Sequence, residues 1–169
     1  MRRLGLFVVS LGLFAGWKVA DAQDAHRHSK PHAAPAAPAH GAAADVRELI
    51  RLPAPMQDHM LANMRDHLMA VGEITGYLAD GKFDAAAKVS EQRLGMSSLS
   101  GHGAAHMAPY MPQPMQDIGT AMHRAASRLA ITIQDADVAP SAEAMAAVNR
   151  GLHEVLSSCN ACHASYRIR

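Results

Sequence analysis

The feature that most constrains the fold is an apolar stripe near the C-terminus whose spacing alternates between three and four residues. An α-helix turns once in about 3.6 residues, so this spacing keeps the whole stripe on one helix face. A helix of this kind buries its apolar face against other helices packed along its length. The stripe consists of Met145, Val148, Leu152, Val155, Cys159, Cys162 and Tyr166.

Three further amphipathic segments precede this one. We expect a helix over 55–80, a shorter Ala-rich helix over 83–94 and a third helix over 114–134, with a long Ser-, Gly- and Pro-containing connection over 96–114. Ser141 is expected to cap the fourth helix. The expected inward positions are Met56, Met60, Met64, Leu68, Val71 and Leu78 in the first helix, and Met115, Ile118, Met122, Ala126, Leu129 and Ile133 in the third.

Four such helices in sequence predict an all-α fold, an antiparallel up-down-up-down four-helix bundle. The expected core is rich in Met and Ala, and only 4% of the chain is aromatic. Small and pliable side chains leave room for a large apolar group. We therefore expect the chain to fold poorly without such a group.

The N-terminal part has a different composition. Residues 1–22 combine a basic start, a short apolar stretch and an Ala-x-Ala site, which predicts a signal peptide and export to the periplasm, with no membrane attachment after cleavage. An uncleaved anchor is the alternative. Residues 23–45 are rich in His, Ala and Pro and predict a disordered linker. The folded domain is then expected over 46–169.

Charge and cysteine content exclude several classes. The formal net charge is +1, which gives no basis for nucleic-acid binding. The two cysteines are three residues apart and cannot staple distant segments. No nucleophile constellation or phosphate-binding loop is present, so we do not expect an enzyme.

Residues 159–163 read Cys-Asn-Ala-Cys-His, the C-x-x-C-H pattern to which c-type haem is attached. Each thiol can add to one haem vinyl group, and His163 lies one helical turn from Cys159, where its imidazole can reach the iron. A redox-active cysteine pair is expected at a helix N-terminus in a βαβ unit, and a zinc site needs a second ligand pair. The motif therefore predicts one covalent haem c per chain.

The C-terminal sequence CNACHASYRIR and the stretch from Gly76 to Ala86 resemble the cytochrome c′ family of four-helix haem proteins. The resemblance covers about 120 residues. It implies His163 as the proximal iron ligand and a first-helix side chain over the other iron face. Met64 is the expected sixth ligand by the family's spacing, with Met60 as the runner-up and His67 as a further alternative.

The resemblance implies two functions, distinguished by the sixth ligand. A Met ligand implies a low-spin electron carrier with periplasmic redox partner proteins, whereas an open site implies a five-coordinate protein that binds gases such as nitric oxide. It also allows for a homodimer. A third hypothesis is metal handling by the linker histidines and the loop residues His102, His106, Met107, Met111 and Met115, for which packing is the simpler explanation. The other helix histidines, His59, His67, His123 and His153, are expected at surfaces or in local hydrogen bonds.

Overall fold

The computed structural model describes residues 44–169, and the expected signal peptide and linker residues 23–43 lie outside this part. The described part is all-α, as predicted, with one pair of two-residue strands. Its elements are β1 (Glu48–Leu49), α1 (Ala54–Ala79), α2 (Phe83–Val89), the π-helical turn η1 (Ser90–Leu94), the 3-10 turn η2 (Met96–Ser98), α3 (Ala104–Met107), the 3-10 turn η3 (Ala108–Tyr110), α4 (Gln113–Val138), α5 (Ala142–Ser165) and β2 (Tyr166–Arg167).

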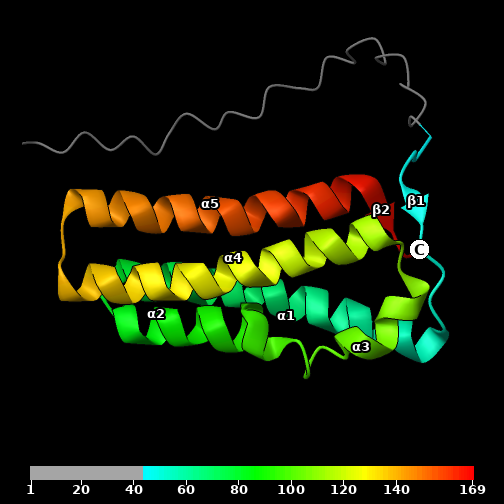
Figure 1. Cartoon of the computed structure of the whole chain (residues 1–169), viewed down its shortest axis with the longest axis horizontal. Coiled ribbons are helices and arrows are strands. Elements are labelled where there is room, and N and C mark those ends of the chain that lie inside the picture. The colour runs from blue at the N-terminus through cyan, green and yellow to red at the C-terminus, as the bar shows by residue number, and fades with distance from the viewer. Residues whose placement is uncertain (1–43) are drawn as a thin grey trace, which may run out of the picture. The chain divides into compact units, whose positions relative to one another are not determined.

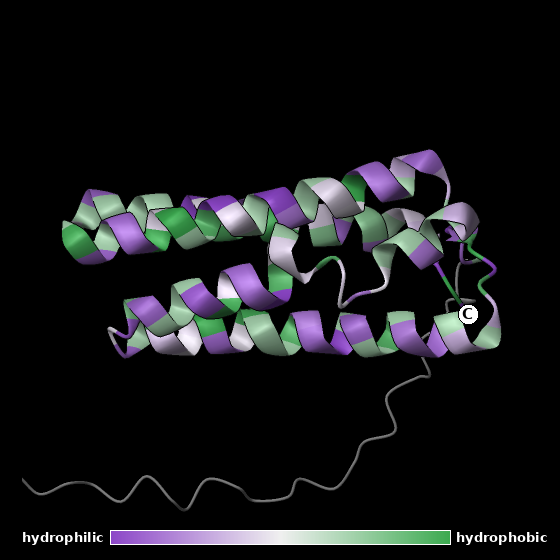
Figure 2. Cartoon of the chain, turned by 60° about the horizontal axis from the view of Figure 1, so that its bottom comes forward, coloured by the Kyte–Doolittle hydropathy of each residue, from purple (hydrophilic) through white to green (hydrophobic). Residues whose placement is uncertain are grey.

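The long helices lie lengthwise beside one another (Figure 1). Helix α4 packs along α5, and α2 packs against both α1 and α4. The short elements α3 and η3 lie at the end of the molecule where the chain terminates (Figure 1). Polar and apolar residues alternate around each long helix (Figure 2), as expected for helices that bury one face.

Local sequence signals set most helix boundaries. The Ser141 hydroxyl accepts a hydrogen bond from the backbone N–H of Ala144 at 3.0 Å, which confirms the expected N-cap of α5. Gly81, at φ 70°, provides the left-handed residue that follows α1. The predicted end of the third helix at 134 is wrong, because α4 continues to Val138 and ends just before Pro140. Aspartates are weak helix breakers on an exposed face, whereas a proline cannot continue the helix.

Two apolar clusters lie in the described part. The larger, which we call the aliphatic core, joins α1, α2, α4 and α5, and includes Ile74, Leu129, Ile133, Val148 and Val155, all fully buried. The smaller, the methionine cluster, consists of Ile50, Met60, Met107 and Met115 and is flanked by Met64, Met111, Cys162 and Tyr166.

The buried face of α1 differs from the predicted one. It carries Met60, Asn63, His67, Ala70 and Ile74, while Leu68, expected to be inward, is 75% exposed. Successive steps of four residues advance about 40° beyond a full turn, so the row 60–64–68 winds away from the core. Alternating steps of three and four stay on one face, and the buried set follows that rule.

The strands connect the start of the described part to its end. Glu48 pairs with Tyr166 and Leu49 with Arg167 in parallel register, and the Ile50 N–H donates to the Arg167 carbonyl at 2.8 Å. The pairing was not predicted, and it draws Tyr166, the last residue of the predicted stripe, out of α5. Among residues 44–169, no helix combines the length and apolar character needed to cross a membrane.

Candidate functional site

A mostly apolar cavity of about 350 Å³ lies beside the methionine cluster. It brings Cys159, Cys162 and His163 of α5 together with Met60 and Met64 of α1 in one lining. Cavities of this size and character are typical of cofactor sites. All of the residues predicted to bind the iron or to form thioether bonds with the haem therefore line one cavity, although they come from opposite ends of the described chain.

The two thiols are half-buried and not disulfide-bonded. Burial raises the pKa of both Cys159 and Cys162 above the usual thiol value. Redox-active cysteine pairs depend instead on a thiol with a lowered pKa, placed near a helix N-terminus or a cation. Cys159 packs against the aliphatic core and Cys162 against the methionine cluster, so the motif lies at the junction of the two.

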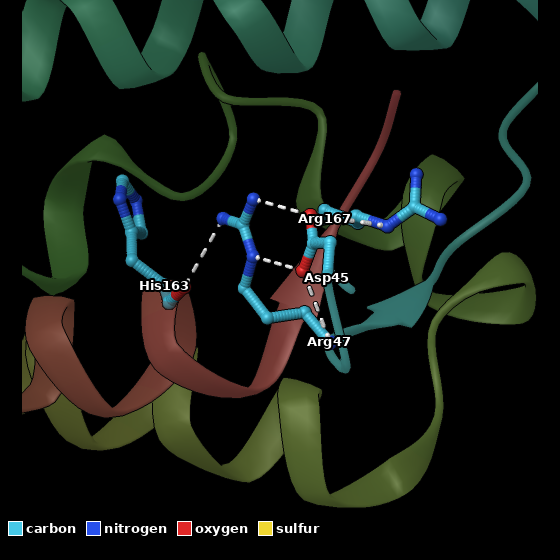
Figure 3. A network of polar contacts seen from close by, with 4 residues as sticks. All are labelled: Asp45, Arg47, His163 and Arg167. Atoms are coloured by element: carbon cyan, nitrogen blue, oxygen red, sulfur yellow. Dashed lines mark hydrogen bonds and ion pairs between the residues drawn. The ribbon is translucent and has the colours of Figure 1, made fainter. Parts of the chain in front are cut away.

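His163 lies in the last turn of α5 with an exposed side chain that borders the cavity. Its carbonyl accepts a hydrogen bond from Arg47 Nη1 at 3.4 Å. Arg47 is held in turn by Asp45, whose carboxylate also lies 3.5 Å from Arg167 Nε (Figure 3). The Arg47 side-chain hydrogen bond lowers the Asp45 pKa to about 2, so this carboxylate stays charged at neutral pH. The segment preceding α1 thus contacts the backbone of the motif, and Asp45, predicted to end the linker, belongs to this network.

The two candidate methionines occupy different positions on α1. Met60 is 8% exposed and forms part of the methionine cluster, whereas Met64 is half-buried and flanks it. Both side chains line the cavity. Met64 lies one turn closer to His67, which also lines the cavity and is buried.

Three histidines form a cluster that the sequence analysis did not predict. Of the two positions expected for the helix histidines, His59 and His153 take the exposed one, whereas His67 of α1 and His123 of α4 are buried and make hydrogen bonds. The ring centroids of His67 and His102 lie 4.7 Å apart, and His123 lies 5.8 Å from the first and 5.5 Å from the second. The three-four spacing of Met60, Asn63, His67 and Ala70 is the signal that would have placed His67 inward.

Hydrogen bonds fix one member of this histidine trio (His67, His102 and His123). His123 Nδ1 donates to the Leu94 carbonyl at 2.7 Å, which leaves Nε2 as an acceptor. His67 Nε2 faces His102 Nδ1 at 3.4 Å. Desolvation lowers the pKa of all three imidazoles, that of His67 to about 4, so they are neutral at pH 7.

The loop residues of the metal-handling hypothesis do not act as one group. Met107, Met111 and Met115 line the cavity, and His102 joins the trio. His106 is exposed and does not border the cavity. Within residues 44–169, no three His, Cys, Asp or Glu side chains are already arranged to hold a metal ion.

Comparison of the chain with family models, curated proteins and solved structures finds no match.

Proposed function

We propose that this protein is a periplasmic c-type cytochrome that carries single electrons through one covalently bound haem c. The observation that carries the proposal is the shared cavity, in which the C-x-x-C-H residues of α5 meet methionines of α1. The apolar lining and the two thiols with raised pKa fit a covalently held porphyrin better than a redox-active cysteine pair.

Each residue of the motif has a distinct task in this proposal. Cys159 and Cys162 would each add an S–H bond across a vinyl C=C bond, which forms two thioethers without any net oxidation. His163 would bind the iron through its imidazole, while Arg47 donates a hydrogen bond to the His163 carbonyl. Haem would supply the one-electron chemistry of its iron, and the chain would supply ligands, burial and fixed geometry.

The methionines of α1 would complete the site. We propose Met64 as the sixth ligand and Met60 as the runner-up, since both line the cavity. Thioether ligation favours ferrous iron and raises the reduction potential. A protein that keeps the same two ligands in both oxidation states suits an electron carrier.

The wider assignment follows from the same motif. We propose an antiparallel up-down-up-down four-helix bundle of the cytochrome c′ kind, exported by residues 1–22, with periplasmic redox proteins as partners. A homodimer is compatible with this assignment. We propose no enzymatic role and no nucleic-acid partner.

Optical spectra of the ferric and ferrous protein, with and without carbon monoxide, test the proposal. Met64→Leu and Met60→Leu form a matched pair, because each removes a thioether and nearly preserves volume. We expect low-spin native protein and a high-spin, carbon monoxide-binding Met64→Leu variant, with Met60→Leu unchanged. The reverse pattern assigns Met60. A native protein that is already high-spin and binds carbon monoxide contradicts the carrier function and supports gas binding.

A further inference from the structure

The histidine trio is a second constellation in the cavity, separate from the C-x-x-C-H motif. Its members come from α1, from the segment between η2 and α3, and from α4, whereas the motif lies on α5. The proposed electron transfer uses none of these three imidazoles, of which His67 and His123 are buried and His102 is half-buried. We propose that His67, His102 and His123 bind a single Cu(I) ion.

The spacing of the rings supports this site. Three imidazoles that bind one ion at about 2.0 Å have ring centres on the order of 5 Å apart. The centroid distances in the trio are 4.7, 5.5 and 5.8 Å. Two ligand nitrogens in a trigonal site are about 3.5 Å apart at the same bond length, and His67 Nε2 and His102 Nδ1 are separated by 3.4 Å.

One hydrogen bond of the trio, that of His123, is of the kind that metal-binding histidines make. Such residues usually donate their second ring N–H to a carbonyl or carboxylate, which fixes the tautomer and directs the lone pair at the metal. His123 donates Nδ1–H to the Leu94 carbonyl at 2.7 Å, so Nε2 carries a lone pair.

The chemistry of the cavity favours a soft monovalent ion. Among residues 44–169, no Asp or Glu side chain lines the cavity. Burying a divalent charge among neutral ligands is more costly than burying a monovalent one. Thioethers favour Cu(I) among the common ions, and four methionines that the proposed haem site does not use line the same cavity: Met107, Met111, Met115 and Met122.

Among the described residues the three side chains are not arranged to hold an ion, although their rings have the required spacing, so binding requires the rings to turn rather than to approach one another. His102 is the member best placed to move. It lies between Gly101 and Gly103, outside any helix, and Gly103 adopts the left-handed conformation with φ 65°. A small adjustment of this segment would turn the His102 ring so that its nitrogen points to the space between the three rings.

Anaerobic titration of the mature full-length protein with Cu(I), in competition with a chromophoric Cu(I) chelator, tests the proposal. We expect His67→Gln and His102→Gln to weaken binding about 100-fold or more, since even loss of a residue that only supports a ligand costs 10- to 100-fold. His106→Gln and His153→Gln are matched controls at exposed positions and should bind as the native protein does. The linker histidines are present in every variant, so their contribution is the same throughout.

A second measurement keeps the test valid if the trio variants unfold. In a full-length variant with His26, His28, His32 and His40 replaced by Gln, X-ray absorption at the copper edge should show imidazole nitrogen ligands. Sulfur-only ligation, or native affinity in the His67→Gln and His102→Gln variants, overturns the proposal. A colourless chain would contradict only the proposed cytochrome function, and Cu(I) binding would then be measured in the Cys159→Ala/Cys162→Ala variant, because free thiols in the same cavity also bind Cu(I).

Discussion

The aliphatic core and the methionine cluster differ in the side chains that fill them. The first is suited to stabilising the fold, and the second to lining a ligand site. Apart from Met122, the aliphatic core is built from Ala, Leu, Ile and Val, most of them with exposures near zero. Small and branched side chains let helices approach closely and settle into one packing arrangement. The methionine cluster is smaller and borders a cavity of about 350 Å³. Flexible thioethers adapt to an irregular space, as the wall of a cofactor site must.

The largest expected change in the free energy of unfolding comes from truncating one buried side chain to alanine in each region. Leu129→Ala should lower the free energy of unfolding by about 3–5 kcal/mol, because Leu129 is fully buried and its removal leaves a void. Met107→Ala should cost only about 2 kcal/mol, since Met107 borders an existing cavity and has fewer packing partners to lose. Denaturant unfolding of both variants measures the difference, and equal losses would show that the two regions are packed alike.

Low pH should destabilise the folded protein through His67 of the histidine trio. Unfolded His67 has a pKa near 6.5 and takes up a proton more readily than folded His67, whose pKa is about 4. The free energy of unfolding should therefore fall as pH decreases from 6.5 toward 4, by about 2 kcal/mol between pH 7 and pH 5 for this residue. Denaturant unfolding at the two pH values measures it. His67→Gln should flatten the dependence, and an unchanged slope in that variant would contradict the assignment.

A pair of glycine substitutions tests how closely the aliphatic core is packed. A methyl group added at Gly151 would lie 3.1 Å from Leu129 Cδ1, whereas one added at Gly76 would meet nothing within 4 Å. Gly76→Ala should raise the free energy of unfolding by about 0.5–1 kcal/mol through helix propensity. The free energy of unfolding of Gly151→Ala should be about 1 kcal/mol lower than that of Gly76→Ala, because Leu129 must shift to accommodate the added methyl group. Thermal unfolding of the two variants gives the comparison, and equal stabilisation would mean that the core is loose there.

The smallest expected effect concerns the network beside His163. Arg47→Ala removes the contact with the His163 carbonyl and the partner of Asp45. We expect a small shift of the haem spectrum or reduction potential with no change in helix content. Lys82→Ala breaks a similar exposed ion pair, with Asp80 at 2.8 Å, and serves as the control. Identical spectra and potentials for both variants would show that Arg47 does not position His163.

Most of the helical fold was predictable because periodicity and capping are local. The alternating spacing in α5 and the Ser141 cap are examples, and the structure agrees with both. The failures have tertiary causes. The inward face of α1 depends on which neighbours it meets, and these favour Ile74 over Leu68. The β1–β2 pairing joins residues more than a hundred positions apart, and no local sequence pattern predicts it.

The candidate site also has one part that the sequence predicted and one part that it did not. A three-residue motif spacing was enough to single out Cys159, Cys162 and His163, because covalent attachment requires that spacing. The histidine trio could not be predicted as a unit, since its members are far apart in sequence and meet only in the folded structure. The only sequence evidence for the trio was that His67 and His123 lie at positions on the buried faces of their helices.

The intact mass of the mature protein, expressed in a host that attaches c-type haem, tests the central claim most directly. The account predicts a denatured chain that begins at Gln23 and is heavier than its sequence by the mass of one haem. The added mass should be absent from the Cys159→Ala/Cys162→Ala double variant. A native chain with the mass of the polypeptide alone would contradict the account.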